Sequence, residues 1–341
     1  MTTNSSVSLT TRKPSELIKE FRKNVAQQNK SWKDLCLDAF HIQYHHNLVY
    51  KSFVDALGVK EDVVQTITEI PFLPIEFFKS KQVVTGEWDV EKVFKSSGTT
   101  ATGRSEHEVD DFNFYLGHAI GLFVQHYGDL SELGIIALLP SYLEQGDSSL
   151  IAMVDELIQL SDFEYSDYYL SKSNDLLKAI MATKSAGRTA FIIGVSFALL
   201  DLAESGKIDL SECVIMETGG MKGRRKELIR TELHGELSET FGVDKIHSEY
   251  GMTELLSQAY SKGDGLFEEN NWLKCLIRDI NDPLTYQEDG KTGGLNVIDL
   301  ANIHSCCFVE TKDLGVKHLD GRVEILGRFD NSDIRGCNLL L

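Results

Sequence analysis

The chain has 341 residues, with 34 Lys and Arg against 52 Asp and Glu, which leaves a formal net charge of −18. Its 42% hydrophobic and 25% charged residues are typical of a globular protein that buries a core. An acidic molecular field opposes binding to nucleic acids and to anionic lipid surfaces, so both function classes are disfavoured.

The first 90 residues are predicted to form a helical segment. Residues 1–15 are polar and lack the apolar core of an export signal. Apolar residues then recur at spacings of three and four over 14–28 and 32–57, which predicts two helices, and Gly58 is suited to end the second. Because no uncharged apolar run approaches the ~20 residues that span a bilayer, we expect a cytoplasmic protein.

Residues 91–271 alternate between short apolar strands and helices. A strand over 92–95 leads into a loop over 96–104, and Ser105 with Glu108 resembles a capping box that opens the next helix. Short all-apolar strands joined by helices are typical of a parallel sheet covered on both faces, so this part is predicted to be an α/β core. Further strands are predicted over 134–139, 189–195, 213–217 and 245–248, with helices over 148–160, 174–184, 197–204 and 226–241.

The remaining residues show short strands separated by turns, which predicts a β-rich subdomain. Its strands are predicted over 273–280, 294–299, 307–311 and 323–327. We therefore expect three parts: a helical N-terminal segment (1–90) packed on the core, an α/β nucleotide-binding core (91–271), and a smaller β-rich subdomain (272–341) that ends in a short mobile tail.

The loop over 96–105, SSGTTATGRS, lies between a predicted strand and a predicted helix. Its backbone N–H groups and six hydroxyls are suited to triphosphate oxygens, and the alternative is a solvated turn. The spacing also matches a Walker A loop, but Arg104 stands where the compact charge of Lys is required. We therefore predict a different kind of phosphate loop, in which the nucleotide-binding residues are Ser97, Gly98, Thr99 and Thr100.

A glycine pair and a tyrosine follow two neighbouring predicted strands. In parallel α/β sheets ligands bind at the carboxyl ends of the strands, so both segments are predicted to face one pocket. Gly219 and Gly220 would let a base or ribose approach the backbone closely. Tyr250, which precedes Gly251, is placed to stack on a base or to line an acyl channel.

Four polar residues are candidates for binding the nucleotide and its metal ion. Glu254 is placed to hold Mg²⁺ between phosphates, and Thr253 to bind a phosphate oxygen. The alternative for Glu254 is an acidic residue in the first turn of a helix. Further along the chain, Asp313 is suited to ribose hydroxyls and Arg328 to bidentate pairing with an α-phosphate, although surface ion pairs would use the same residue types.

Several short segments occur in an order that is shared with a known group of enzymes. They are SSGTT at 96–100, YGMTE at 250–254, Thr311-x-Asp313, Gly327-Arg328 and Arg335-Gly336. This order resembles the adenylate-forming, acyl-activating superfamily. A narrower resemblance, to the LuxE-type acyl-protein synthetases of bacterial fatty-acid reductase systems, rests on FLP at 72–74, FKS at 78–80, TGGMKGRRK at 218–226 and the ending IRGC at 334–337.

The resemblance implies that a fatty acid and MgATP give an acyl-adenylate and pyrophosphate, and that the acyl group then moves to a protein thiol. It implies ATP and Mg²⁺ as cofactors and an acyl reductase or acyltransferase as the protein partner. Ala101 departs from the superfamily, whose phosphate loop continues with Gly. Because the chain ends five residues past Gly336, we expect it to lack the mobile C-terminal lid domain and its Lys. The roles implied are phosphate binding by Thr99, Thr100 and Thr253, contacts to adenine by Gly219 and Gly220, and ribose binding by Asp313.

Cys337 is the candidate acyl acceptor. The six cysteines show no C-x-x-C spacing, so neither a zinc site nor a disulfide framework is predicted. A thiol near a chain end, with Arg335 close by to favour the thiolate, is suited to take the acyl group as a thioester and pass it on. The alternative is an ordinary buried or frayed thiol. The predicted catalytic residues are Cys337, Thr253, Glu254 and Arg328.

Two other functions stay open at this point. One is a coenzyme A ligase that resembles the phenylacetate ligases. The other is a non-catalytic subunit that keeps a nucleotide pocket and regulates a reductase or an acyltransferase.

Overall fold

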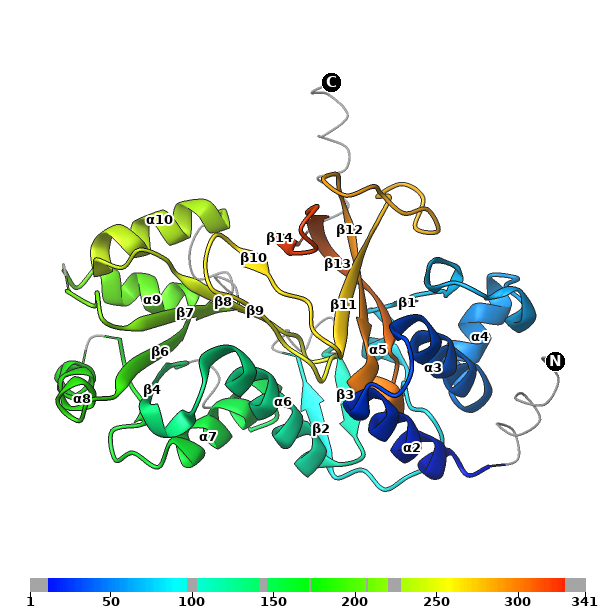
Figure 1. The fold of residues 1–341 in the computed structure, drawn as a ribbon, viewed down its shortest axis with the longest axis horizontal. Helices are drawn as coiled ribbons and strands as arrows, with labels where there is room; N and C mark the ends of the chain where they lie inside the picture. Colours follow the sequence, from blue (N-terminus) through cyan, green and yellow to red (C-terminus); the bar gives the residue numbers. More distant parts are fainter. Residues whose placement is uncertain are drawn as a thin grey trace. The chain divides into compact units, whose positions relative to one another are not determined.

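The computed structural model describes residues 12–96, 103–140, 146–171, 173–206, 208–219 and 228–328 (Figure 1). The chain divides into two compact units. Unit 1 comprises Met1–Tyr115, Met252–Ser257 and Glu269–Leu341, and unit 2 comprises Leu116–Gly251 and Gln258–Glu268. The division into 1–90, 91–271 and 272–341 stays a prediction.

Unit 1 begins with three helices, α2 (Pro14–Gln27), α3 (Trp32–His46) and α4 (Leu48–Ala56). The helix expected over 32–57 is therefore two helices, and that prediction was wrong. Asn47 separates them because its backbone is extended and its side chain accepts a hydrogen bond from the Tyr50 N–H at 2.9 Å, which caps α4. The same side chain is fully buried and donates to the Ser305 carbonyl at 2.8 Å, so tertiary contacts fix the break.

An antiparallel sheet forms the β-rich part of unit 1. Its strands follow the order β14, β13, β12, β11, and β1 pairs in parallel with β13. The four strands predicted in this part of the chain are present. Three of them have small shifts in their ends, whereas β13 ends at Lys317, six residues later than predicted. Their bounds, with those of the small elements around them, are β1 (Leu73–Pro74), β11 (Leu273–Arg278), β12 (Thr292–Asp299), β13 (Phe308–Lys317), β14 (Val323–Arg328), η1 (Glu61–Val63), η2 (Ile67–Glu69), α5 (Phe77–Ser80) and η5 (Leu300–His304).

A hairpin of β2 (Lys92–Lys95) and β3 (Glu106–Val109) lies where a helix was expected to begin at Ser105. That expectation was wrong. Alternate residues of β3 are buried, as in a strand, and Lys95 on β2 forms an ion pair with Glu106 at 2.7 Å. Helix α6 (Phe112–Tyr127) begins later, where the Asp111 carboxylate accepts the Phe114 N–H at 2.8 Å.

Unit 2 contains a sheet in the order β5, β4, β6, β7, β8, β9, in which all neighbouring pairs are parallel except β8 and β9. Figure 1 shows α9 and α10 on one face of it and α6 and α7 on the other. Every residue of β4 is buried, as expected for a strand covered on both faces. The bounds are β4 (Leu133–Leu138), β5 (Asp167–Tyr168), β6 (Thr189–Val195), β7 (Val214–Thr218), β8 (His247–Tyr250), β9 (Ala259–Ser261), β10 (Leu266–Phe267), η4 (Leu130–Glu132), α7 (Ser149–Ser161), α8 (Asn174–Ser185), α9 (Ser196–Ala203) and α10 (Arg230–Phe241).

The predicted alternation of strands and helices is therefore present in unit 2. Ser148 and Ser173 cap the starts of α7 and α8 with their side-chain oxygens, which fixes where these connecting helices begin. Within the ranges that the structure describes, no helix combines the length and the apolar character needed to cross a bilayer.

Candidate active site

The carboxyl ends of β7 and β8 place a glycine and a tyrosine at one edge of the sheet in unit 2. The strands are parallel and Thr218 pairs with Glu249, so Gly219 and Tyr250 follow at the same level. Gly219 is exposed and has a positive φ of 69°, which favours glycine. The Ser196 hydroxyl donates to the Gly219 carbonyl at 2.7 Å and fixes this turn.

Tyr250 and Gly251 pack closely against other residues of unit 2. Tyr250 is 9% exposed, and its ring meets Phe267 edge to face with centroids 6.0 Å apart. Gly251 cannot carry a side chain without a shift, because an added Cβ would collide with Oε1 of Glu249. The chain here is therefore close-packed around Tyr250, whereas Gly219 and Gly251 are exposed.

Two buried carboxylates on these strands lie in opposite electrostatic settings. Burial alone would raise the pKa of Glu217, but His234 and Arg230, whose Nε lies 3.1 Å from Oε1, lower it overall. Burial and repulsion by Glu217 raise the pKa of Glu249 to about 7, against a hydrogen bond from the Thr218 hydroxyl that stabilises its charge. Sequence reasoning did not assign a role to either carboxylate.

Glu254 is the central carboxylate of the candidate site in unit 1. It is 5% exposed, and burial raises its pKa against a hydrogen bond from Ser105 and the positive charges of Arg328 and Lys79. A divalent cation would stabilise the ionised carboxylate, so the site fits Mg²⁺, which prefers oxygen ligands and takes few of them from protein. Among the described residues, no group of three His, Cys, Asp or Glu side chains is arranged to hold a metal ion.

Asp313 and Arg328 lie opposite each other on β13 and β14. The Arg328 Nε is 3.8 Å from Oδ1 of Asp313, and the guanidinium side chain is 78% exposed. Asp313 is 7% exposed and its N–H donates to the Thr311 hydroxyl at 3.1 Å. Arg328 is therefore an exposed cation that lies near the Asp313 carboxylate and acts on Glu254 through its charge.

Lys79 is a cation that sequence reasoning did not single out, although it stands in the FKS segment at 78–80. It lies on the short helix α5, is exposed, and is close enough to lower the pKa of Glu254. Its carbonyl is 3.8 Å from where a Cβ on Gly103 would stand, and Gly103 has a positive φ of 76°. Lys79 thus borders the described end of the predicted phosphate loop.

Six of the predicted site residues lie outside the described residues, so their predicted roles stay predictions. They are Ser97, Gly98, Thr99, Thr100, Gly220 and Cys337.

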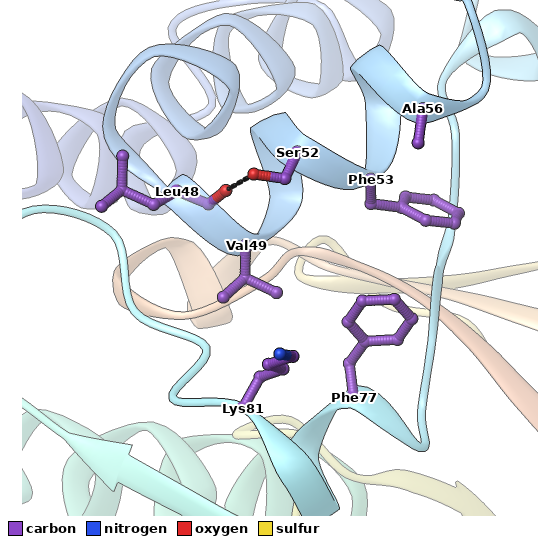
Figure 2. A pocket seen from close by; sticks show the side chains of 7 residues that line it. All are labelled: Leu48, Val49, Ser52, Phe53, Ala56, Phe77 and Lys81. Atoms are coloured by element: carbon purple, nitrogen blue, oxygen red, sulfur yellow. Dashed lines mark hydrogen bonds between the residues drawn. The ribbon is translucent and has the colours of Figure 1, made fainter.

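A separate pocket of about 380 Å³ opens between α4 and α5 in unit 1 (Figure 2). Val49, Phe53 and Phe77 give it an apolar lining, and Lys81 stands at its edge. None of the predicted site residues lines it, so this pocket is distinct from the candidate site.

Comparison with known proteins agrees with the resemblance seen in the sequence. Residues 17–107 match the family described as "Acyl-protein synthetase, LuxE". A curated relative from Vibrio harveyi, named long-chain-fatty-acid–luciferin-component ligase, is 25% identical over 93% of this chain and 88% of its own. The chain is similar to the LuxE-type acyl-protein synthetases. A protein of the same name from Aliivibrio fischeri is 24% identical over 92% of this chain and 88% of its own, and these relatives confirm the prediction of a ligase.

Solved structures confirm the fold class predicted from the sequence. ATP-bound MatB from Rhodopseudomonas palustris superposes with a TM-score of 0.53 at 18% identity, over 81% of this chain and 52% of MatB. A 2-hydroxyisobutyryl-CoA ligase in complex with 2-HIB-AMP and CoA gives a TM-score of 0.63 at 11% identity, over 88% of this chain and 70% of its own. The chain thus spans about half the length of MatB.

Proposed function

We propose that the chain uses MgATP to activate a long-chain fatty acid, or a related carboxylic acid, and loads the acyl group onto a protein thiol. The observation that carries the proposal is the setting of Glu254, a buried carboxylate held by Ser105 with Arg328 and Lys79 close by. Similarity over 93% of the chain to a protein named as a long-chain-fatty-acid ligase supports the choice of substrate.

In the proposed first half-reaction, a carboxylate oxygen of the acid forms a bond to the α-phosphorus of ATP, which is a substrate here. The bond from that phosphorus to the bridging oxygen breaks, and pyrophosphate leaves with the electron pair. This displacement needs alignment and charge neutralisation rather than covalent help from the protein. Arg328 and Lys79 supply positive charge, and Mg²⁺ held by Glu254 would neutralise phosphate oxygens.

In the second half-reaction a thiolate sulfur forms a bond to the acyl carbon, and AMP leaves. The proposed acceptor is Cys337, which would pass the acyl group to a reductase or an acyltransferase. A cytoplasmic location, where ATP and reduced thiols are available, suits both steps.

The other proposed roles follow the chemistry of each residue. Asp313, a buried carboxylate on β13, is proposed to accept hydrogen bonds from the ribose hydroxyls. Thr253 is proposed to bind a phosphate oxygen. The remaining proposed nucleotide-binding residues are Ser97, Gly98, Thr99, Thr100, Gly219, Gly220, Tyr250 and Gly251.

Acid-dependent exchange of pyrophosphate into ATP tests the first half-reaction. We expect exchange with one class in a panel of fatty and aromatic acids, and a loss of at least 100-fold in Glu254→Gln, because a neutral amide binds Mg²⁺ much more weakly than a carboxylate. The matched control is Glu310→Gln, a half-buried carboxylate of the same unit whose pKa is also raised by burial, and it should keep activity within about twofold. Full activity of Glu254→Gln would remove this residue from the proposal.

Whether the acyl group moves to a protein thiol or to coenzyme A tests the second half-reaction. We expect hydroxylamine-sensitive labelling of the protein by a radioactive fatty acid, and its loss in Cys337→Ser. Transfer to coenzyme A with no protein labelling would favour a coenzyme A ligase. ATP binding with no exchange for any acid would favour a regulatory subunit.

A further inference from the structure

The backbone carbonyls of the two candidate residues Thr253 and Glu254 accept hydrogen bonds from buried side chains. The His107 imidazole, on β3, donates from Nδ1 to the Thr253 carbonyl at 2.7 Å. The Asn302 amide, on η5, donates to the Glu254 carbonyl at 2.8 Å and to the Cys306 carbonyl at 2.9 Å. All of these residues belong to unit 1, and the bonds join segments 146 and 48 residues apart.

The end of the same segment is tied down by a third buried side chain. The Asp299 carboxylate accepts the N–H groups of Leu256 at 2.8 Å and Ser257 at 2.9 Å, and the Ser257 hydroxyl at 2.6 Å. Asp299 is fully buried and lies at the end of β12, so it is part of the rigid sheet. The segment 253–257 therefore has fixed contacts at both of its ends.

The geometry around His107 leaves its ring little freedom. The imidazole is 1% exposed, stacks on His304 with centroids 5.2 Å apart, and meets the Phe78 ring edge to face at 5.8 Å. Burial lowers the pKa of His107 to about 4, so the ring is neutral at physiological pH. A neutral ring whose Nδ1 donates has one defined tautomer, and its direction is set by packing.

We infer that His107 and Asn302 are positioning residues that hold the Thr253 and Glu254 carbonyls, and so aim the two side chains at the magnesium nucleotide. This inference rests on the proposed function of Thr253 and Glu254. Neither residue touches the nucleotide in this scheme. Their effect is to keep the loop in its binding-competent conformation before ATP arrives, which avoids an ordering cost on binding.

The decisive comparison is between His107→Leu and His107→Asn. Leu removes the donor, whereas Asn carries its amide nitrogen close to the position of the imidazole Nδ1 and can keep the bond to Thr253. Loss of one buried hydrogen bond corresponds to about a tenfold fall in the competent fraction of the loop. We expect the KM for MgATP in pyrophosphate exchange to rise about tenfold in His107→Leu, with kcat within about twofold, and to be restored in His107→Asn.

Tyr50→Phe is the matched control for simple loss of stability. Its hydroxyl donates to the Pro71 carbonyl at 2.7 Å and is fully buried in the same unit, so this bond holds a different segment from 253–257. We expect it to lower the unfolding midpoint without changing KM. An equal rise in KM in Tyr50→Phe, or failure of His107→Asn to restore KM, would overturn the inference.

Hydrogen exchange of the ATP-free protein separates this inference from the proposed function. Amides over 253–257 should exchange at least tenfold faster in His107→Leu and in Asn302→Ser than in the wild type or Tyr50→Phe. If the wild type shows no exchange of pyrophosphate with any acid, the proposed function fails. Hydrogen exchange over 253–257 still decides whether His107 and Asn302 hold this segment in place. Unchanged protection in both variants would overturn the positioning role, and Asn302→Ser serves alone if His107→Leu does not fold.

Discussion

Replacing Glu249 by Gln is expected to stabilise the protein at alkaline pH. Burial raises the pKa of this carboxyl from 4.5 to about 7, and its hydrogen-bond partner is the hydroxyl of Thr218. The folded state therefore holds a proton that the unfolded state releases between pH 4.5 and 7, so stability falls as pH rises through that window. A shift of this size corresponds to about 3 kcal/mol above pH 7.

Gln reproduces the neutral carboxyl in shape and can still accept from Thr218, so it removes the ionisation cost. Unfolding in urea at pH 5 and pH 8 measures the effect. We expect Glu249→Gln to exceed the wild type by about 1 to 3 kcal/mol at pH 8, the lower figure applying if the new amide N–H groups lack partners, and by much less at pH 5. A difference that is the same at both pH values would refute the reasoning.

Glu217 is the matched control because it is a buried carboxylate on the neighbouring strand, with the opposite shift in pKa. Its folded pKa is lowered overall, since Arg230 and His234 outweigh burial, so its contribution to stability is present above the unfolded pKa and lost in acid. Glu217→Gln breaks a partly buried ion pair and should destabilise the protein by about 2 kcal/mol at pH 8. If the free energy of unfolding rises in Glu249→Gln and falls in Glu217→Gln, the two effects come from the charges around each carboxylate and not from the introduction of Gln as such.

Three further predictions concern unit 1. Lys79→Met should raise the KM for MgATP in pyrophosphate exchange about tenfold with little change in the urea midpoint, since the side chain is exposed; an unchanged KM would remove Lys79 from the site. Asn47→Ala should destabilise by about 2 to 3 kcal/mol in urea, because it loses a helix cap and the bond to Ser305; a loss under 0.5 kcal/mol would contradict this. Since burial lowers the folded pKa of His107 from 6.5 to about 4, its contribution is present above pH 6.5 and lost as pH falls toward 4, so the midpoint of His107→Asn should fall less between pH 7 and pH 4.5 than that of the wild type.

The sequence predicts strands β4, β6, β7 and β8 of unit 2 and the helices between them because their patterns are strong, whereas the short strands β5, β9 and β10 are not predicted. The run Ile135-Ile136-Ala137-Leu138 has no polar residue and forms the fully buried β4. The helices that follow begin at serines such as Ser148, whose capping role is local and therefore visible in sequence.

Two errors in unit 1 arise where distant contacts override a local pattern. Ser105 and Glu108 have the spacing of a capping box, but pairing of β3 with β2 decides the structure. Asn47 is compatible with a helix, and its buried contact with Ser305, 258 residues away, ends that helix instead.

The candidate site shows the same division between local and distant information. Glu254 and Asp313 could be proposed from short segments whose residue types suit a magnesium nucleotide. His107 and Asn302 could not, because what links them to the site is a pair of backbone carbonyls that any sequence would offer. Lys79 was visible as part of a shared segment, but its charge matters only once α5 is placed beside Gly103.

In the described part of the chain, the buried glutamates Glu217, Glu249 and Glu254 differ in what balances their charge, and the difference supports the role proposed for Glu254. The charge of Glu217 is balanced by Arg230, which lies within hydrogen-bond distance, so a partner within the protein already stabilises this carboxylate. Among the described residues, the groups that act on Glu249 besides burial are the Thr218 hydroxyl and the Glu217 carboxylate, and the pKa of Glu249 is raised to about 7. Glu254 has cations near enough to act on it, yet burial still raises its pKa, and one of those cations, Arg328, is 78% exposed. A carboxylate in that state gains most from a divalent cation, and the exposed arginine gains most from phosphate oxygens, so one magnesium nucleotide would satisfy both.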